Sequence, residues 1–390
     1  MQSEVATKKR NIQAAFMYLV TCFMWFSIYV YVPILSPYCE GMGLSYSMVG
    51  VVIGSYGFVQ LVCRIPIGIL SDTLKKRKFF LMFGLCASLL SDAGFFFVHN
   101  PNLLVIFRGL AGLAASTWAI YMTMYLGYFT REEQPKAMGV INSAMSVGQV
   151  IATFLGGIIA TRISESWTFG VAGVASIVGL AVCAFLPKPD IDKKPLKISD
   201  FIETAKNHYL LFFSSMAILL QVAMYAGPFG FVPNILRDIG SSNFVLGLST
   251  TFSSLPAILS AILAGTFFRR KFGTQKTIVM AFAAFALVMI ATAFTRNVVF
   301  ILILQLISGF AKGLLLTLLT SMAIKEIPAV TRSTATAFFQ AVYGVGMTFG
   351  PILAGWLADI RGMNFSFIMI GLLTMCGAIL VGCMRCFNYD

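Results

Sequence analysis

Long apolar runs alternate with short polar segments along the whole chain. An α-helix needs about 20 apolar residues to cross the hydrocarbon core of a bilayer. Twelve runs reach that length, at residues 14–35, 46–71, 79–97, 101–126, 137–160, 167–187, 208–236, 244–268, 277–295, 298–323, 333–358 and 364–384. The pattern therefore predicts an all-α membrane protein with twelve transmembrane helices.

Composition excludes a soluble domain. Only 11% of the 390 residues are charged and 58% are hydrophobic, whereas about a quarter of the residues of a soluble domain are charged. The net charge of +13 would suit a nucleic-acid-binding protein, but such proteins gather their cations on one soluble face. Here the cations lie in short loops between apolar runs. We expect a lipid bilayer as the environment and no nucleic-acid partner.

Residue types that carry catalysis are scarce. The eight cysteines are scattered through apolar sequence without a CxxC pair or a ligand spacing, so they are expected to be buried hydrophobes rather than metal ligands. The two histidines, His99 and His208, lie near the ends of apolar runs, and no P-loop sequence occurs. We expect no metal, no cofactor, no enzymatic activity and no ATP-driven pump.

Loop charges orient the chain. If both termini lie on one side, the segments on that side hold 21 of the 28 Lys and Arg residues, and the loops on the other side hold 4. Cytoplasmic loops of membrane proteins carry an excess of Lys and Arg. The chain is thus expected to have both termini in the cytoplasm, and its short loops, by analogy, favour a bacterial inner (plasma) membrane. No feature indicates an oligomer, so a monomer is expected.

The two halves of the sequence resemble each other. The polar interval 188–207 predicts a cytoplasmic linker between two six-helix bundles, residues 1–187 and 208–390. Val147-Gly148 aligns with Val345-Gly346 at an offset of 198 residues. The spacing predicts a parallel internal repeat.

One loop carries a family resemblance. The sequence GILSDTLKKRK, which starts at Gly68, resembles the G-x-L-x-D-R-x-G-R/K signature of the major facilitator superfamily, with Thr73 and Lys75 in place of the family's Arg and Gly. The resemblance implies two six-helix halves related by a pseudo-two-fold repeat, secondary active transport by alternating access, and a substrate site near the midplane between the halves. It also implies a gating motif of Gly68, Asp72 and Arg77. Asp72 is expected to meet a cation or a helix N-terminus at the membrane edge.

Four charged residues fall inside the apolar runs, namely Arg64, Asp92, Arg108 and Lys312. A charge at mid-depth costs about 2.5 to 3.5 kcal/mol on the insertion scale. Arg64 shares a helical face with Gln60, Gly68 and Ser71. This stripe either lines the inner half of a pathway or only snorkels and packs against the other half.

Asp92 and Arg108 are expected at equal depth on adjacent helices, where they could form a buried ion pair. The sequence that starts at Arg108 resembles the family's R-x-x-Q-G-x-x-A-A motif in the fourth helix, with Ala111 and Ser116 at two of its positions. In the family this Arg is associated with proton coupling. The resemblance implies that Arg108 modulates the protonation of Asp92; the alternative is a permanent structural pair.

Lys312 lies near the centre of its span and has Gln305 and Ser308 on the same face. No acid in the seventh, tenth or eleventh span is available to pair with it, so a substrate anion is its expected partner. Side chains on neighbouring spans are candidates to complete the site, together with Arg108: Trp25, Tyr29, Gln221, Tyr225, Gln340 and Tyr343. The alternative for the aromatic residues is packing or an interfacial belt.

The sign of the buried charge indicates the cargo. The first, fourth, seventh and tenth spans contain no acid but hold Arg108 and Lys312, which favours an organic anion, with a carboxylate as the preferred group. Transport is expected by proton coupling (symport or antiport) or by exchange of a counter-substrate. The alternative is a polyspecific drug or amphiphile exporter, because abundant Phe and Met adapt to varied ligands.

Overall fold

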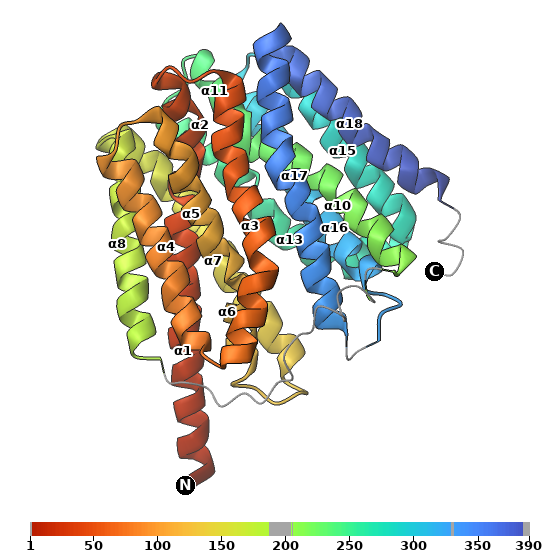
Figure 1. Cartoon of the computed structure of the whole chain (residues 1–390). Coiled ribbons are helices and arrows are strands. Elements are labelled where there is room, and N and C mark those ends of the chain that lie inside the picture. Colours follow the sequence, from red (N-terminus) through yellow and green to blue (C-terminus); the bar gives the residue numbers. More distant parts are fainter. Residues whose placement is uncertain (1, 187–203, 205, 329–330, 385–390) are drawn as a thin grey trace.

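A computed structural model describes the chain except for residues 1, 187–203, 205, 329–330 and 385–390 (Figure 1). It confirms the twelve predicted spans, and the described residues contain helices and no strand. Most of the predicted linker, 188–207, lies outside the described residues. Large apolar side chains such as Phe185 and Phe294 point outward and are 80% and 73% exposed. Such a surface needs a lipid environment, and the chain is an integral multi-pass membrane protein.

Each half contributes six spans, several of which are built from more than one helix. The first six spans consist of α1 (Gln2–Tyr29) with α2 (Val32–Gly41), α3 (Tyr46–Leu74), α4 (Arg77–Phe97), η1 (Pro101–Leu103) with α5 (Leu104–Ser116) and α6 (Trp118–Leu126), α7 (Gln134–Arg162) and α8 (Glu165–Ala184). The last six consist of α10 (His208–Ala226) with η2 (Gly227–Phe231) and α11 (Val232–Asp238), α12 (Asn243–Phe252) with α13 (Leu255–Leu263), η3 (Ala264–Phe268) and α14 (Arg269–Phe272), α15 (Thr274–Phe294), α16 (Val298–Ala323), α17 (Arg332–Arg361) and α18 (Met363–Cys383).

The predicted repeat is visible in the helix breaks. Span one is interrupted between Tyr29 and Val32, and span seven passes through a π-helical turn, η2. In both spans the next helix opens with a Val-Pro pair, at Val32 and at Val232. Proline suits the first turn of a helix because the N–H that it lacks would have no partner there. The repeated pair therefore places a break at the same level of both spans.

Glycines repeat the packing within each half. A Cβ on Gly148 of α7 would lie 2.7 Å from the carbonyl oxygen of Cys22 on α1. A Cβ on Gly346 of α17 would lie 2.3 Å from the carbonyl oxygen of Ile218 on α10. Only glycine permits so close an approach of two backbones. Span five thus packs on span one as span eleven packs on span seven, in agreement with the predicted alignment.

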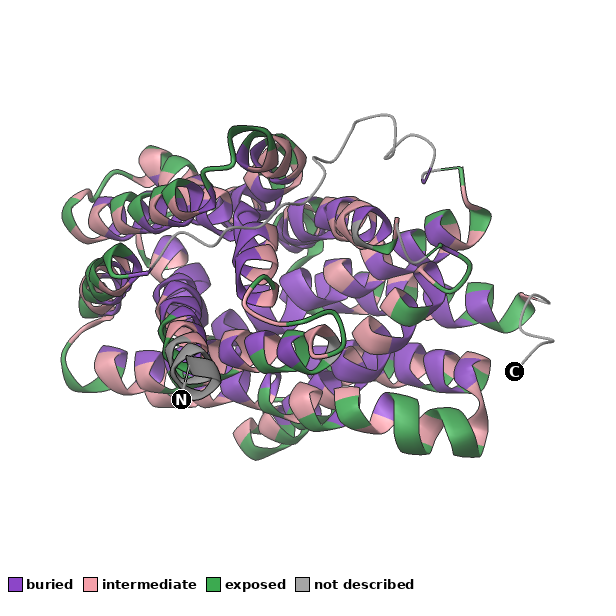
Figure 2. Ribbon diagram, turned by 90° about the horizontal axis from the view of Figure 1, so that it is seen from below, coloured by how far each residue is buried: buried purple, intermediate pink, exposed green. Residues whose placement is uncertain are grey.

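The two faces of the bundle differ. The basic face carries the N-terminus, at the bottom of Figure 1, and the loop that joins α3 to α4. At the opposite face, which we call the sealed face, helices of the two halves touch directly: Cβ atoms on Gly50 and Gly54 of α3 would lie 2.2 and 2.4 Å from the carbonyl oxygens of Pro351 and Thr348 on α17. Seen from the basic face, buried segments gather toward the middle and exposed ones toward the rim (Figure 2).

Candidate functional site

Six aromatic side chains from both halves meet in the interior and form what we call the central cluster: Trp25, Tyr29, Tyr56, Trp118, Tyr225 and Phe229. The ring of Trp25 lies 5.5 Å from Trp118 and 5.8 Å from Tyr29. Tyr29 in turn lies 5.7 Å from Phe229 across the boundary between the halves. All six side chains are buried. Three predicted site residues, Trp25, Tyr29 and Tyr225, are thereby brought together.

Tyr29 and Tyr225 join the halves near the helix breaks. Their hydroxyl oxygens are 3.5 Å apart, either one donating. The ring of Tyr225 stacks on Tyr56 at 6.2 Å and meets the edge of Phe229 at 5.6 Å. The indole N–H of Trp25 is buried and has no hydrogen-bond partner among the described residues. An orphaned donor in the interior is costly unless a ligand or water completes it.

Arg108 borders the cluster from the first half and is well provided with partners. Its Nη1 donates to the Tyr31 hydroxyl at 3.0 Å and to the Ile28 carbonyl at 3.4 Å. Its guanidinium carbon lies 4.5 Å from the ring centre of Tyr56 and 5.3 Å from that of Tyr31. Only 2% of the residue is exposed. Hydrogen bonds from Nη1 and two cation–π contacts therefore compensate much of this buried charge without an acid, while Nε has no hydrogen-bond partner among the described residues.

The structure does not contain the ion pair between Asp92 and Arg108 that the sequence analysis considered. Within the described chain no nitrogen of Arg108 lies within 4.0 Å of an oxygen of Asp92. Asp92 accepts instead from the Ser176 hydroxyl on α8 at 2.9 Å, and its other oxygen has no partner among the described residues. The two side chains point to different neighbours, Asp92 to Ser176 and Arg108 to Tyr31.

Lys312 borders the cluster from the second half. It lies near the midpoint of α16, and its Nζ lies 4.7 Å from the ring centre of Phe229. No carboxylate oxygen among the described residues lies within 4.0 Å of Nζ. The residue is only half-buried despite its depth. A half-buried lysine therefore lies in the interior without a counter-ion in the described chain.

The other predicted ligands make contacts away from the cluster. Gln305 accepts from Ser308 on its own helix at 3.5 Å. Gln340 accepts from Arg64 Nη1 at 3.0 Å, and Tyr343 packs edge-on against Phe339. The Cβ of Gln221 lies beside Gly346 of α17. None of these contacts tests whether the side chains reach a bound cargo.

The gating motif lies at the basic face. Asp72, at the end of α3, accepts from Arg77 Nη2 at 3.1 Å, while Gly68 is half-buried one turn earlier. Lys78 caps the end of α8 through the carbonyls of Ala184 and Leu186 at 2.7 and 2.6 Å. Of the two partners expected for Asp72, the structure shows the cation.

A second ion pair anchors the first helix at this face. Arg10 Nη1 lies 3.1 Å from Glu133 Oε2. The pKa of Glu133 lies below its ordinary value, mainly because the backbone N–H of Thr130 donates a hydrogen bond to the carboxylate. The positive charge of Arg10 lowers this pKa further. The ion pair between Glu133 and Arg10 thus connects the start of α7 to α1.

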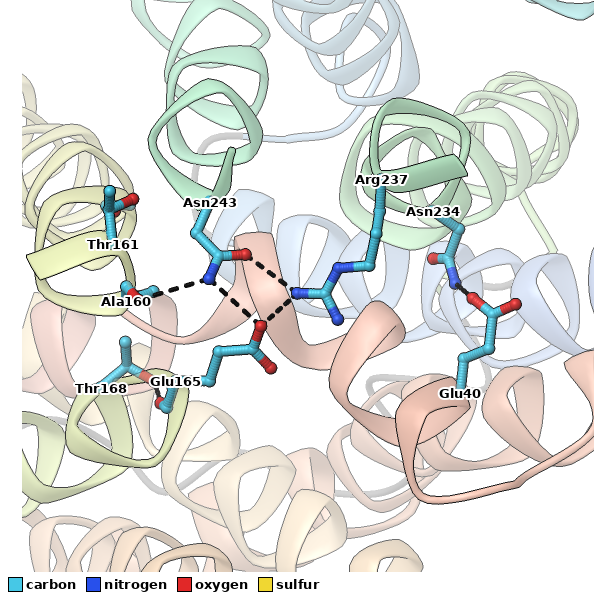
Figure 3. A network of polar contacts seen from close by, with 9 residues as sticks. Glu40, Ala160, Thr161, Glu165, Thr168, Asn234, Arg237 and Asn243 are labelled. Carbon is cyan, nitrogen blue, oxygen red and sulfur yellow. Dashed lines mark hydrogen bonds and ion pairs between the residues drawn. The ribbon is translucent and has the colours of Figure 1, made fainter. Parts of the chain in front are cut away.

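Charged side chains join the halves at the sealed face (Figure 3). Arg237 of α11 pairs with Glu165 of α8, and Asn243 donates to the same carboxylate at 3.1 Å. Beside them Asn234 donates to Glu40 of α2. Both acids come from the first half, and their partners come from the second.

The N-terminus of α3 is capped from the other half. Asp359 of α17 accepts from the backbone N–H groups of Tyr46 and Ser47 at 3.0 and 2.8 Å, and from the Ser47 hydroxyl. A carboxylate is well placed there because the first N–H groups of a helix lack internal partners and carry positive charge. The sealed face is thus held by charge as well as by close packing.

Sequence reasoning missed Tyr31, Tyr56 and Phe229, which border the two cations, and Trp118, which packs on Trp25 in the central cluster. Tyr56 could have been found, because it lies one turn before Gln60 on α3 and so extends the polar stripe of Gln60 and Arg64. Phe229 lies between Gly227-Pro228 and Gly230, a combination that signals an irregular turn. Nothing in the sequence marks Tyr31 or Trp118.

The fold, with its two repeated six-span halves around a central cluster, is that of a membrane transporter. The family model for the Major Facilitator Superfamily matches residues 17–233 and 211–385. The chain belongs to this superfamily and is a transporter, not an enzyme.

Relatives extend over most of the chain. It is 27% identical to an uncharacterized MFS-type transporter of Methanocaldococcus jannaschii, over 85% of this chain and 87% of the relative. A gallate transporter of Pseudomonas putida is 26% identical over 48% of this chain and 42% of the relative. Multidrug resistance protein 2 of Bacillus subtilis is 23% identical over 89% and 88%. The structure of the nucleoside transporter NupG superposes with a TM-score of 0.79 at 14% identity, over 95% of this chain and 98% of that one.

Proposed function

We propose that this protein is a secondary active transporter that moves a small organic anion, with a carboxylate as the recognised group, by alternating access. The observation that carries the proposal is Lys312. It lies at the middle of a membrane span, is half-buried, and has an aromatic ring instead of a carboxylate beside its ammonium among the described residues.

Energetics favours an anionic cargo. A lysine at mid-membrane costs about 2.5 to 3.5 kcal/mol on the insertion scale, and the Phe229 ring returns about 0.5 to 2 kcal/mol of this. A carboxylate would compensate the remaining charge, and its attraction is strong where water is excluded. The free N–H of Trp25 offers a second polar contact, and the rings of the central cluster suit an aromatic or planar body.

The similarity to a gallate transporter supports an aromatic carboxylate, because gallate combines a ring with an anionic group. This similarity covers 48% of the chain. An aromatic carboxylate as the cargo is therefore proposed together with the transport activity.

We further propose that both termini and the linker near 188–207, which joins halves 1–187 and 208–390, lie in the cytoplasm of a bacterium. The excess of cations in the loops of the basic face supports this orientation. Asp92 is the proposed proton carrier. It is fully buried with one oxygen free of partners in the described chain.

A polyspecific exporter of drugs or amphiphiles is the second candidate. The aromatic lining of the central cluster favours it, since rings and methionines adapt to varied ligands. The similarity to a multidrug resistance protein extends over most of the chain and supports the same function.

A ligand screen on the purified protein separates the two candidates. Benzoate, gallate, a neutral nucleoside and a lipophilic cation would be tested for thermal stabilisation of wild type and of Lys312→Gln. We expect the two carboxylates to stabilise wild type and to lose that effect in Lys312→Gln. Stabilisation by the cation alone, or by all classes regardless of Lys312, would favour the polyspecific exporter. Uptake of the stabilising ligand into proteoliposomes would then establish transport.

A further inference from the structure

Arg64 is a buried cation that the central cluster does not use. Only 5% of the residue is exposed, on the face of α3 that meets α17 of the other half. Its Nη1 donates to Gln340 Oε1 at 3.0 Å, whereas its Nε is buried without a hydrogen-bond partner among the described residues. A neutral amide is thus the hydrogen-bond acceptor that the structure shows for this guanidinium. Such a charge costs several kcal/mol to bury without an anion.

Arg64 lies between the central cluster and the basic face. It follows Tyr56 of the cluster by eight residues, or about 12 Å along the helix axis. Gln60 lies between them and is buried, and Ser71 continues the stripe two turns further, with a buried hydroxyl that has no partner among the described residues. A polar stripe thus runs from the cluster toward the basic face.

The contact between Arg64 and Gln340 differs from the other contacts that join the halves. At the sealed face, Glu165 meets Arg237, and Asp359 meets the positive N-terminus of α3. Charge is balanced in both places. A contact whose role was only to hold the halves together would be stronger with a carboxylate at position 340. The amide at Gln340 leaves the positive charge uncompensated and available.

We propose that Arg64 forms, with Gln340, a second anion-binding subsite on the path between Lys312 and the basic face, with Ser71 as the next polar group along that path. The carboxylate of the cargo replaces the Gln340 carbonyl as acceptor and is held by the guanidinium fork, which fits it in two parallel hydrogen bonds. The subsite lowers the barrier for an anion that leaves or enters the central cluster. This inference rests on the proposed function, since it requires an anionic cargo.

The test uses full-length protein, gallate as the probe, and two measurements: equilibrium binding in detergent and the rate of uptake into proteoliposomes. Arg64→Gln and Gln340→Glu are expected to lower the uptake rate at least about tenfold, with the dissociation constant within about twofold because Lys312 is retained. The glutamate acts by pairing permanently with Arg64. Arg162→Gln removes an exposed cation at the sealed face and serves as the matched control, with both quantities unchanged.

Gln340→Leu separates the subsite from a mechanical contact. If Gln340 only holds the halves together, leucine breaks the contact and slows uptake more than glutamate does. If Arg64 receives the cargo, leucine leaves the guanidinium free and slows uptake by no more than about threefold, less than glutamate. The subsite is overturned if Arg64→Gln transports at the wild-type rate, or if leucine is the more damaging change.

Failure of the subsite differs from failure of the proposed function. If gallate does not bind, or binds equally to Lys312→Gln, the anion transporter is rejected and the subsite with it. If binding depends on Lys312 but uptake is indifferent to Arg64→Gln and Gln340→Glu, the subsite alone is rejected. Should Arg64→Gln fail to fold, the comparison of Gln340→Glu with Gln340→Leu gives the decision, because both variants retain Arg64.

Discussion

Two cations border the central cluster from opposite halves, and their surroundings differ. Arg108 is 2% exposed and has a hydroxyl, a carbonyl and two aromatic faces around it. Lys312 is half-buried, and a single aromatic face is its recorded contact. Both satisfy the same expectation, a cation inside a span. In the described chain Arg108 has two hydrogen bonds and two ring contacts, although its Nε has no hydrogen-bond partner, whereas Lys312 has one ring contact.

The difference predicts separate roles. We expect the cation with several partners to contribute to the stability of the fold, and the half-buried cation without a counter-ion to contribute to ligand binding. Stability and binding measurements on matched variants can therefore test whether the two cations have these different roles.

The largest expected effect is on stability, at Arg108. Arg108→Leu removes two hydrogen bonds of a charged donor and two cation–π contacts, and should lower the free energy of unfolding by about 2 to 3 kcal/mol. Arg108→Lys keeps the charge but not the fork and should recover about half of the loss. Denaturation in mixed detergent micelles gives both values. A leucine variant as stable as wild type would mean that Arg108 is as uncompensated as Lys312.

Lys312 should show the reverse pattern. Lys312→Gln is expected to weaken carboxylate binding at least about tenfold, equivalent to about 1.4 kcal/mol, without loss of thermal stability in the absence of ligand. Lys312→Arg should rescue binding only in part, since a planar fork does not replace a compact ammonium. Titration calorimetry with gallate or benzoate measures the change. Wild-type affinity in Lys312→Gln would contradict the proposal that Lys312 binds an anionic cargo.

The spans, the repeat and the cation at the middle of α16 could be predicted because they are local or periodic properties of the sequence. The position of Asp92 relative to Arg108 could not. Depth follows from counting residues, but the direction of a side chain around its helix axis depends on which neighbours pack there. Asp92 turns to Ser176 of α8, while Arg108 turns to Tyr31 of span one. For the same reason the sequence does not assign Phe229 to the site, although it lies within a predicted span.

A double-mutant cycle measures whether Asp92 and Arg108 interact directly. Removal of one partner of a direct buried pair costs about 3 to 5 kcal/mol. Because Asp92 bonds to Ser176 instead, Asp92→Asn should cost about 1 kcal/mol. Its coupling energy with Arg108→Leu should also stay below about 1 kcal/mol, as for residues without direct contact. Strong coupling would restore the ion pair. If Asp92 carries the proton, the asparagine variant should exchange substrate yet fail to accumulate it against a gradient.

The smallest effect on either cation is expected from Asp72, which pairs with Arg77 at the basic face, outside the central cluster. Asp72→Asn weakens that pair but leaves the surroundings of Arg108 and Lys312 intact. The dissociation constant for a carboxylate should therefore stay within about twofold of wild type, while the transport rate should fall if the contact at the end of α3 belongs to the gate that the family resemblance implies. Asp72→Glu keeps the charge and should transport faster than the asparagine variant. A large loss of equilibrium binding with unchanged turnover would mean that Asp72 acts on the site instead of on the gate, and that the two cations are not independent of the basic face.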